Sequence, residues 1–320
     1  MAGGAGSAAV SGSPGPAPPP VGSAVAIGVF DGLHLGHRAI LDTALARARA
    51  AGGRCVVMSF DPHPDVVLGR GRFHSPPPLT PLGEKHRRLA GLGVDAFDVL
   101  PFTRELASLE PEAFVDRHLV TPHAPFALVV GEGFALGRGR VGTVERLRAI
   151  GGTRGFEVEA VPLVVLDGAP VSSTRTRTAL SEGRVAEAAR LLGRRYSLAG
   201  TVVTGERRGR ELGYPTANLR LHEDQVVPAD GIYAVLARLS GGELPLPAAM
   251  SIGMRPTFDG QLRTLEVHLL DWTGDLVGRP LEVEFVAWIR SELRFESAEA
   301  LVAAMDRDVA ETRRRLAGTT

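Results

Sequence analysis

The pattern of apolar residues changes near residue 195 of this 320-residue chain, and that change constrains the fold more than any other feature of the sequence. Before it, apolar runs alternate with helical patterns. Helices are predicted over 36–52 and 82–93, and strands over 24–30, 54–60, 96–102, 126–132 and 156–163. Alternation of this kind is typical of a parallel sheet with helices on both faces.

The part of the chain beyond this change has a different pattern. Between Ser197 and Val286 the predicted strands are short and are separated by glycine-containing turns, without a long helical pattern. We therefore expect an antiparallel β-barrel or sandwich. A connector helix is predicted over 181–194. A terminal helix is predicted over 297–316, capped by Ser297, with inward-facing residues Leu301, Val302, Met305, Val309 and Leu316.

Length and composition predict a tail and two domains. After Met1, residues 1–22 contain only Ala, Gly, Ser, Pro and Val, which bury too little apolar surface to offset the entropy of ordering. This segment also lacks the pattern of a signal peptide, so we expect a disordered tail. The predicted division is a tail over 1–22, an α/β domain over 23–183 and a β-rich domain over 184–320.

Charge and cysteine content exclude several classes of protein. The 36 basic and 36 acidic residues balance, so net charge gives no reason to expect nucleic acid or an anionic membrane as a partner. The single cysteine, Cys55, rules out an intramolecular disulfide framework and fits a reducing compartment. No apolar run approaches the ~18 residues of a membrane span. We expect a cytoplasmic protein, and the oligomeric state stays open.

Only one of the 36 basic residues is a lysine, Lys85. A P-loop needs its lysine within Gly-Lys-Ser or Gly-Lys-Thr, whereas Lys85 lies within Glu-Lys-His. If the chain uses ATP, it does so without a P-loop lysine.

The first predicted strand runs into GVFDGLHLGH (28–37), and a helix follows. In an open α/β sheet, ligands bind beyond the carboxyl ends of strands, where glycines let phosphates approach and helix starts offer free N–H groups. Two histidines add imidazole donors, so the segment predicts a phosphate site. The alternatives are histidines that merely cap the helix, and a zinc site that includes His63. The candidate ATP-binding residues are Gly28, Phe30, Asp31, Gly32, His34, Gly36 and His37.

A second segment, VSSTRTR (171–177), begins another predicted helix. Its hydroxyls and the planar fork of arginine suit phosphate oxygens, although a plain N-cap with solvated arginines is the better interpretation of the segment alone. Together with the histidine pair it predicts further phosphate contacts from Ser173, Thr174 and Arg177. GRGRVG (137–142) formally matches GxGxxG, but its strand ends near Val130. We reject a dinucleotide site and expect a loop near the same phosphates.

The β-rich part contains GYPTAN (213–218), in which Pro215 fixes the backbone. Thr216 and Asn218 then project oxygens to one side, which suits Mg²⁺ shared with substrate phosphates; a turn with an Asx cap is the alternative. A basic loop over 205–210 suits a cover for ATP. The candidate nucleotide-binding residues are Gly205, Gly213, Pro215, Thr216 and Asn218, with Thr216 and Asn218 as metal ligands.

Glu266 lies on an alternating strand and shares its face with Thr264 and His268, whereas Leu265, Val267 and Leu269 point the other way. A carboxylate on a polar face is usually solvated. Beside a bound hydroxyl it becomes a candidate general base.

These segments occur in one order with SFDPHP (59–64), GIYAV (231–235), SIGMRPTF (251–258) and LEVHLL (265–270). The ordered set resembles the bifunctional bacterial riboflavin kinase/FAD synthetase family over nearly all of the chain after residue 23. The resemblance implies a Rossmann-like FMN adenylyltransferase domain of nucleotidyltransferase type, followed by a riboflavin kinase barrel. It also implies that ATP phosphorylates riboflavin to FMN and adenylylates FMN to FAD with release of pyrophosphate, with Mg²⁺ at both sites.

The resemblance also implies roles for the candidate residues. His34 and His37 would bind ATP phosphates in adenylyl transfer, and Ser173, Thr174 and Arg177 would form a second clamp. In the kinase, Thr216 and Asn218 would hold Mg-ATP, and the general base would be Glu266.

The sequence departs from the family pattern at Gly133, Leu136, Ser251 and Val277, where Asn or Asp, an aromatic residue, Asn and Tyr are customary. Two alternatives therefore stay open. One is a riboflavin kinase whose first domain is degenerate or has altered specificity. The other is a flavin-binding sensor or carrier without turnover.

Overall fold

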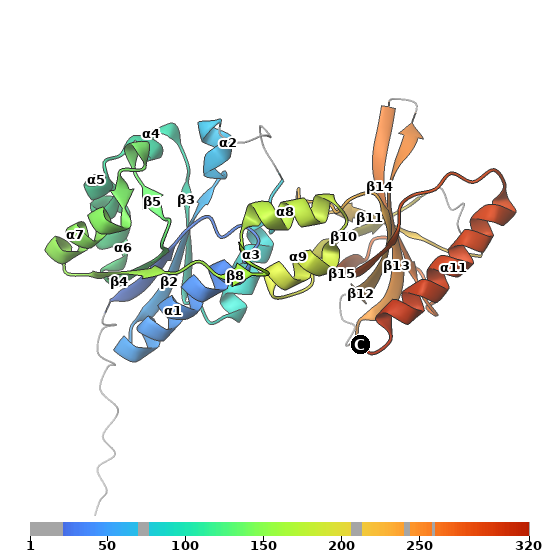
Figure 1. Ribbon diagram of the computed structural model, residues 1–320, viewed down its shortest axis with the longest axis horizontal. Helices are drawn as coiled ribbons and strands as arrows, with labels where there is room; N and C mark the ends of the chain where they lie inside the picture. Colours follow the sequence, from blue (N-terminus) through green and yellow to red (C-terminus); the bar gives the residue numbers. More distant parts are fainter. Residues whose placement is uncertain (1–21, 70–76, 206–212, 240–243, 258–259, 320) are drawn as a thin grey trace, which may run out of the picture.

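The computed structural model describes residues 22–69, 77–205, 213–239, 244–257 and 260–319. The disordered tail predicted for residues 1–22 lies outside this range except for Gly22. Figure 1 shows a helix-covered sheet at one end of the molecule and a barrel at the other, with two helices between them.

The first part is a parallel five-stranded sheet with strand order β3-β2-β1-β4-β7. Its strands are β1 (Ser23–Ile27), β2 (Arg54–Asp61), β3 (Ala96–Pro101), β4 (Pro125–Gly131) and β7 (Glu157–Val161). All five residues of β1 are buried, because this strand lies at the centre of the sheet and carries apolar side chains on both faces. The predicted α/β architecture is confirmed.

Helices cover both faces of the sheet. On one face, α1 (Leu35–Ala51) and α3 (Leu82–Gly91) bury an apolar stripe against alternate strand residues such as Ala24 and Ala26. On the other face, Val25 and Ile27 meet helices that the strand–helix pattern did not predict. These are α4 (Arg104–Ser108), α5 (Pro111–Val115), the π-helical turn η1 (Asp116–Val120), α6 (Thr121–His123) and α7 (Val144–Arg154).

Several short elements complete this part. A short helix, α2 (Pro64–Leu68), follows β2. The loop predicted over 131–142 contains a small hairpin of β5 (Ala135–Leu136) and β6 (Gly142–Thr143), joined by the 3-10 turn η2 (Arg138–Arg140). A second small hairpin, β8 (Val165–Leu166) with β9 (Ala169–Pro170), precedes the connector helices.

The connector helix predicted over 181–194 is observed as α9 (Val185–Leu192). The helix predicted to begin within 171–177 is observed as α8 (Ser173–Ser181), and Gly183 separates the two. Gly183 has φ +73°, and a Cβ there would lie 2.4 Å from the ring of Trp288, so the break needs glycine for both conformation and space. Both helices pack their apolar residues against the barrel core, between the sheet and the barrel in Figure 1.

The second part is a closed antiparallel barrel in the order β10-β11-β14-β13-β12-β15, which decides between the barrel and the sandwich. Its strands are β10 (Ser197–Val203), β11 (Ala217–Leu221), β12 (Gly231–Leu239), β13 (Leu246–Thr257), β14 (Gly260–Leu269) and β15 (Pro280–Arg290). Among the described residues no helix combines the length and the apolar character needed to cross a membrane.

The terminal helix α11 (Ala298–Leu316) is capped by Ser297, as predicted. The predicted inward-facing residues Leu301, Val302, Met305 and Val309 are half-buried, and Leu316 is buried. The other buried residues of the helix, which were not predicted, are Ala304, Asp308 and Thr312. Asp308 is buried because the guanidinium of Arg290 on β15 donates to both of its carboxylate oxygens, at 2.8 and 2.6 Å. This bidentate pair holds α11 on the barrel.

Candidate active sites

The loop between β1 and α1 is held in an unusual backbone conformation. Phe30 and Leu33, neither of them a glycine, adopt left-handed φ angles of 51° and 45°. The Phe30 ring is fully buried and packs edge-on against the ring of His37, with centroids 5.3 Å apart. The predicted residues Gly28, Gly32 and Gly36 lie in this loop and at the start of α1. The conformation of this turn therefore determines the direction in which the start of α1 and its histidines point.

Asp31 is the anchor of this loop. One carboxylate oxygen accepts from the backbone N–H groups of Leu79 (2.9 Å) and Thr80 (3.3 Å), and the other accepts from Arg177. The backbone carbonyl of Asp31 accepts from the hydroxyl of Ser173 at 2.8 Å. The two predicted phosphate segments, far apart in sequence, thus lie side by side. The Asp31 carboxylate organises them rather than facing an open space.

His34 and His37 lie together at the start of α1. Their rings are stacked with centroids 3.6 Å apart, and the backbone N–H of His37 donates to Nδ1 of His34 at 3.2 Å. His34 therefore does cap the helix. Nδ1 of His37 is buried and has no hydrogen-bond partner among the residues that the structure describes. A buried polar atom of this kind is where a ligand atom is expected.

Burial keeps both imidazoles neutral. It lowers the pKa of His34 to about 4, against an opposing effect of Asp31. Burial also lowers the pKa of His37 well below its usual value, and the neighbouring His34 and Lys85 add to that effect. Since Nδ1 of His34 accepts a hydrogen bond, the proton of the neutral ring is on Nε2. The histidines thus offer N–H donors without a full positive charge.

We predict that His34 stays in the Nε2–H form from about pH 8 down to about pH 5.5, with a pKa of about 4. Because this pKa lies below that of the unfolded chain, the protein should lose stability as pH falls from about 6.5 toward 4. Long-range proton–nitrogen NMR of the imidazoles measures tautomer and pKa directly. A His34 midpoint near 6.5 would contradict the prediction.

The zinc alternative finds no support. Nδ1 of His63 caps α2 by accepting from the backbone N–H of Asp65 at 3.1 Å. Within the described part of the chain, no three His, Cys, Asp or Glu residues are grouped so that they could hold a metal ion.

The barrel brings the other candidates together. The Thr216 hydroxyl donates to Oε2 of Glu266 at 3.1 Å, and Asn218 on β11 lies directly opposite Glu266 on β14. Leu265, Val267 and Leu269 are buried in the barrel core, which confirms the predicted alternation around Glu266. Hydroxyl, amide and carboxylate oxygens are thus gathered at one place on the sheet.

Two further residues shape this cluster. A Cβ at Gly205 would lie 2.0 Å from Nδ2 of Asn218, so only glycine lets the amide side chain lie against this backbone. The rest of the predicted basic loop, residues 206–210, lies outside the described residues. The carbonyl of Pro215 is 2.9 Å from Nδ1 of His268, and Gly213 precedes it with φ +86°. β14 therefore contacts this part of the chain before Thr216, at Pro215, and after it, at Ala217 and Asn218.

Ser251 is a member of this cluster that the sequence motifs did not predict. Ser251 on β13 is the register partner of Glu266 on its other side, so Asn218, Glu266 and Ser251 form a row across three strands. The only signal in the sequence was the departure from the family pattern at this position.

The comparisons with known proteins cover both parts of the chain. A family model described as FAD synthetase matches residues 18–175, and one described as riboflavin kinase matches residues 192–316. A Listeria monocytogenes protein named bifunctional riboflavin kinase/FMN adenylyltransferase is 40% identical over 294 residues, which is 92% of each chain. The chain belongs to the bifunctional riboflavin kinase/FMN adenylyltransferase family.

Other members of this family agree. An Escherichia coli protein with the same name is 40% identical over 290 residues, 91% of each chain. A solved structure named macrolide-efflux protein from Streptococcus pneumoniae superposes with a TM-score of 0.84 at 32% identity. It covers 92% of this chain and 94% of that one. The two structures therefore share their overall fold over most of both chains.

Two of the departures from the riboflavin kinase/FMN adenylyltransferase pattern lie beyond β4. Gly133 is exposed, and a Cβ there would meet no atom within 4 Å, so a larger residue fits without rearrangement. Leu136 is buried in the apolar cluster under α5 and α7, where it fills the space with aliphatic rather than aromatic atoms.

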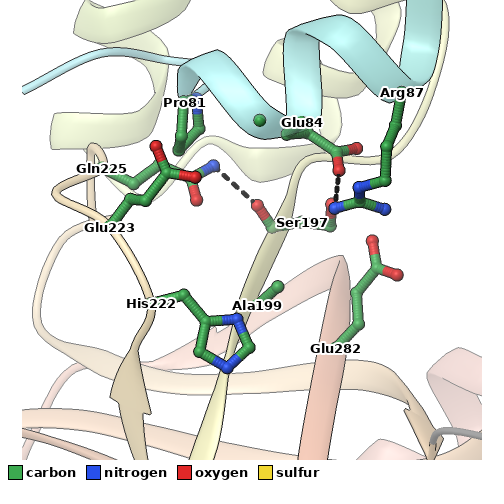
Figure 2. A pocket seen from close by; sticks show the side chains of 10 residues that line it. Pro81, Glu84, Arg87, Ser197, Ala199, His222, Glu223, Gln225 and Glu282 are labelled. Carbon is green, nitrogen blue, oxygen red and sulfur yellow. Dashed lines mark hydrogen bonds and ion pairs between the residues drawn. The ribbon is translucent and has the colours of Figure 1, made fainter. Parts of the chain in front are cut away.

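A pocket of about 370 Å³ lies between α3 and the barrel, apart from both clusters. Figure 2 shows Gln225 reaching from the barrel side to Ser197, and Glu84 paired with Arg87 on α3. Gln225 also donates to the carbonyl of Leu79 at 3.1 Å. Gln225, in the wall of this pocket, thus connects Ser197 of the barrel to Leu79, whose backbone N–H donates to Asp31.

Proposed function

We propose that this chain is a bifunctional enzyme that makes FMN from riboflavin and ATP, and FAD from FMN and ATP. The observation that carries this function is the presence, in one chain, of a FAD synthetase domain and a riboflavin kinase domain, in relatives that span over 90% of it. The two reactions attack different phosphorus atoms, and each has its own cluster of suitable residues.

In adenylyl transfer, a phosphate oxygen of FMN attacks the α-phosphorus of ATP, and the bond from that phosphorus to the bridging oxygen breaks as pyrophosphate leaves. The nucleophile is already anionic, so the site needs donors rather than a base. We assign this role to the N–H groups of His34 and His37 and to the start of α8 with Ser173 and the exposed Thr174. Arg177 supports them by holding Asp31.

In the kinase reaction, the terminal ribityl hydroxyl attacks the γ-phosphorus and must lose a proton. We assign the proton acceptor to Glu266, whose carboxylate is held by the Thr216 hydroxyl. Binding and alignment of ATP on the barrel then supply most of the remaining rate enhancement.

The donor chemistry beside Glu266 fits Mg²⁺, because Thr216 and Asn218 offer the neutral oxygens that this ion accepts alongside substrate phosphates. We propose that Thr216 and Asn218 hold it together with ATP. When bound, Mg²⁺ neutralises charge on the β- and γ-phosphate oxygens.

Chromatographic product analysis tests the function. Riboflavin with Mg-ATP should give FMN and then FAD, and FMN with Mg-ATP should give FAD and pyrophosphate. Folded protein that forms neither FMN nor FAD would refute the proposal. FMN without FAD would instead support a kinase with a degenerate first domain, and the exposed Gly133 gives the variant to try, Gly133→Asn.

A further inference from the structure

The only lysine of the chain is buried beneath the β1–α1 loop. Lys85 lies on α3 with a relative exposure of 6%, and its Nζ donates to the carbonyl of Val29 at 2.9 Å. Burying an ammonium group costs free energy unless it finds partners, so this placement needs a reason. An apolar residue would be the less costly choice if α3 only had to pack against the sheet.

The atom that Lys85 holds lies at the entrance to the left-handed turn. Val29 precedes Phe30, and its carbonyl also accepts from the Ser59 hydroxyl on β2 at 2.9 Å. Two donors from two different elements thus fix the orientation of one peptide. The left-handed conformations of Phe30 and Leu33 are sparsely populated and persist only where the surroundings hold them.

The charge of Lys85 acts on the same groups. Burial lowers its pKa, and the nearby carboxylates of Asp31 and Asp61 oppose that effect. In turn, Lys85 contributes to the lowered pKa values of His37 and His63. The ammonium group therefore acts on His37 of the imidazole pair, and its charge is of the sign that attracts phosphates.

We propose that Lys85 is a positioning residue for adenylyl transfer: by holding the Val29 carbonyl it fixes the turn that directs the helix start and both histidines at the phosphates of ATP. This inference rests on the proposed adenylyl transfer at the β1–α1 loop. Lys85 then supports phosphate chemistry indirectly, through the loop that it holds, in a chain whose sequence excludes a P-loop.

The test uses the full chain with Lys85→Met, which keeps the length of the side chain and removes the donor and the charge. FAD formation from FMN should fall roughly 10- to 100-fold, mainly in kcat, because small displacements of reacting groups have effects of this size. FMN formation by the barrel of the same chain should be unchanged, and Lys85→Arg should recover part of the loss. The matched control is Arg87→Met, since Arg87 lies on the same helix and contacts Glu84 instead of the loop.

FAD formation by Lys85→Met within twofold of the wild-type rate would overturn the inference. Wild-type protein that makes no FAD would instead overturn the proposed function, so the two failures are distinguishable. If Lys85→Met makes no FMN either, the variant has not folded, and the inference is then tested on the wild-type protein by NMR.

Wild-type protein that contains ¹³C-labelled lysine gives one Cε signal, because the chain has one lysine. α,β-Methylene-ATP with Mg²⁺ should shift that signal, and an unchanged signal would overturn the inference.

Discussion

Glu266→Gln should lower FMN formation from riboflavin by about 10²–10⁴-fold, the range associated with loss of a general base. The reason is that the ribityl hydroxyl must lose its proton during attack, and glutamine cannot accept it. The amide still offers an oxygen to the Thr216 hydroxyl, which donates to Oε2 of Glu266 at 3.1 Å, so the strand should keep its structure. FAD formation from added FMN should proceed at the wild-type rate. Separate assays with riboflavin and with FMN measure both effects.

Glu282→Gln is the matched control for this variant. Glu282 is another half-buried glutamate of the barrel, but it lies on β15 and lines the pocket of Figure 2, away from Thr216. It should leave both reactions unchanged. A Glu266→Gln chain that phosphorylates riboflavin normally would remove the general base from the mechanism and would favour a binding role for this carboxylate.

His37→Ala should impair FAD formation and spare riboflavin phosphorylation, which is the reverse of the effect expected for Glu266→Gln. It removes the imidazole whose buried Nδ1 lacks a hydrogen-bond partner in the described part of the chain. We expect FAD formation from FMN to fall by about 10²–10³-fold, as when one donor to developing charge is lost. Riboflavin phosphorylation should continue unchanged, because the barrel does not use this loop. FAD and pyrophosphate release measured with saturating FMN give the rate.

The control for His37→Ala is His86→Ala, which removes an exposed imidazole from α3. Loss of FMN formation in the His37 variant would mean that the substitution unfolds the chain. Normal FAD formation would mean that the phosphates bind elsewhere.

The grouping of candidate residues at the β1–α1 loop was predictable from the sequence because the interactions there are local. A strand, a glycine-containing turn and a helix start are consecutive in the chain, and the carboxyl ends of parallel strands share one edge of the sheet. The same holds for Thr216 and Asn218, which lie two residues apart on one strand face. Which residues lie together at these two places was therefore predictable from spacing, and their role in phosphate chemistry is our proposal.

Contacts between distant segments were not predictable in this way. The role of Asp31 depends on Arg177, 146 residues away, and on backbone N–H groups near Leu79. Closure of the barrel depends on the pairing of Ser197–Thr201 with Pro280–Glu284, which no local pattern encodes. The break at Gly183 follows from the position of Trp288. Each of these outcomes is decided by tertiary packing, which overrides local preference.

The central claim is that one chain carries two independent nucleotide sites, and mixing the two inactive variants tests it directly. Glu266→Gln alone and His37→Ala alone should each fail to make FAD from riboflavin and ATP. Together they should make FAD, because FMN released by the His37 variant can be adenylylated by the Glu266 variant. A mixture that makes no FAD, although each variant keeps its remaining reaction, would contradict the claim that the two sites work independently.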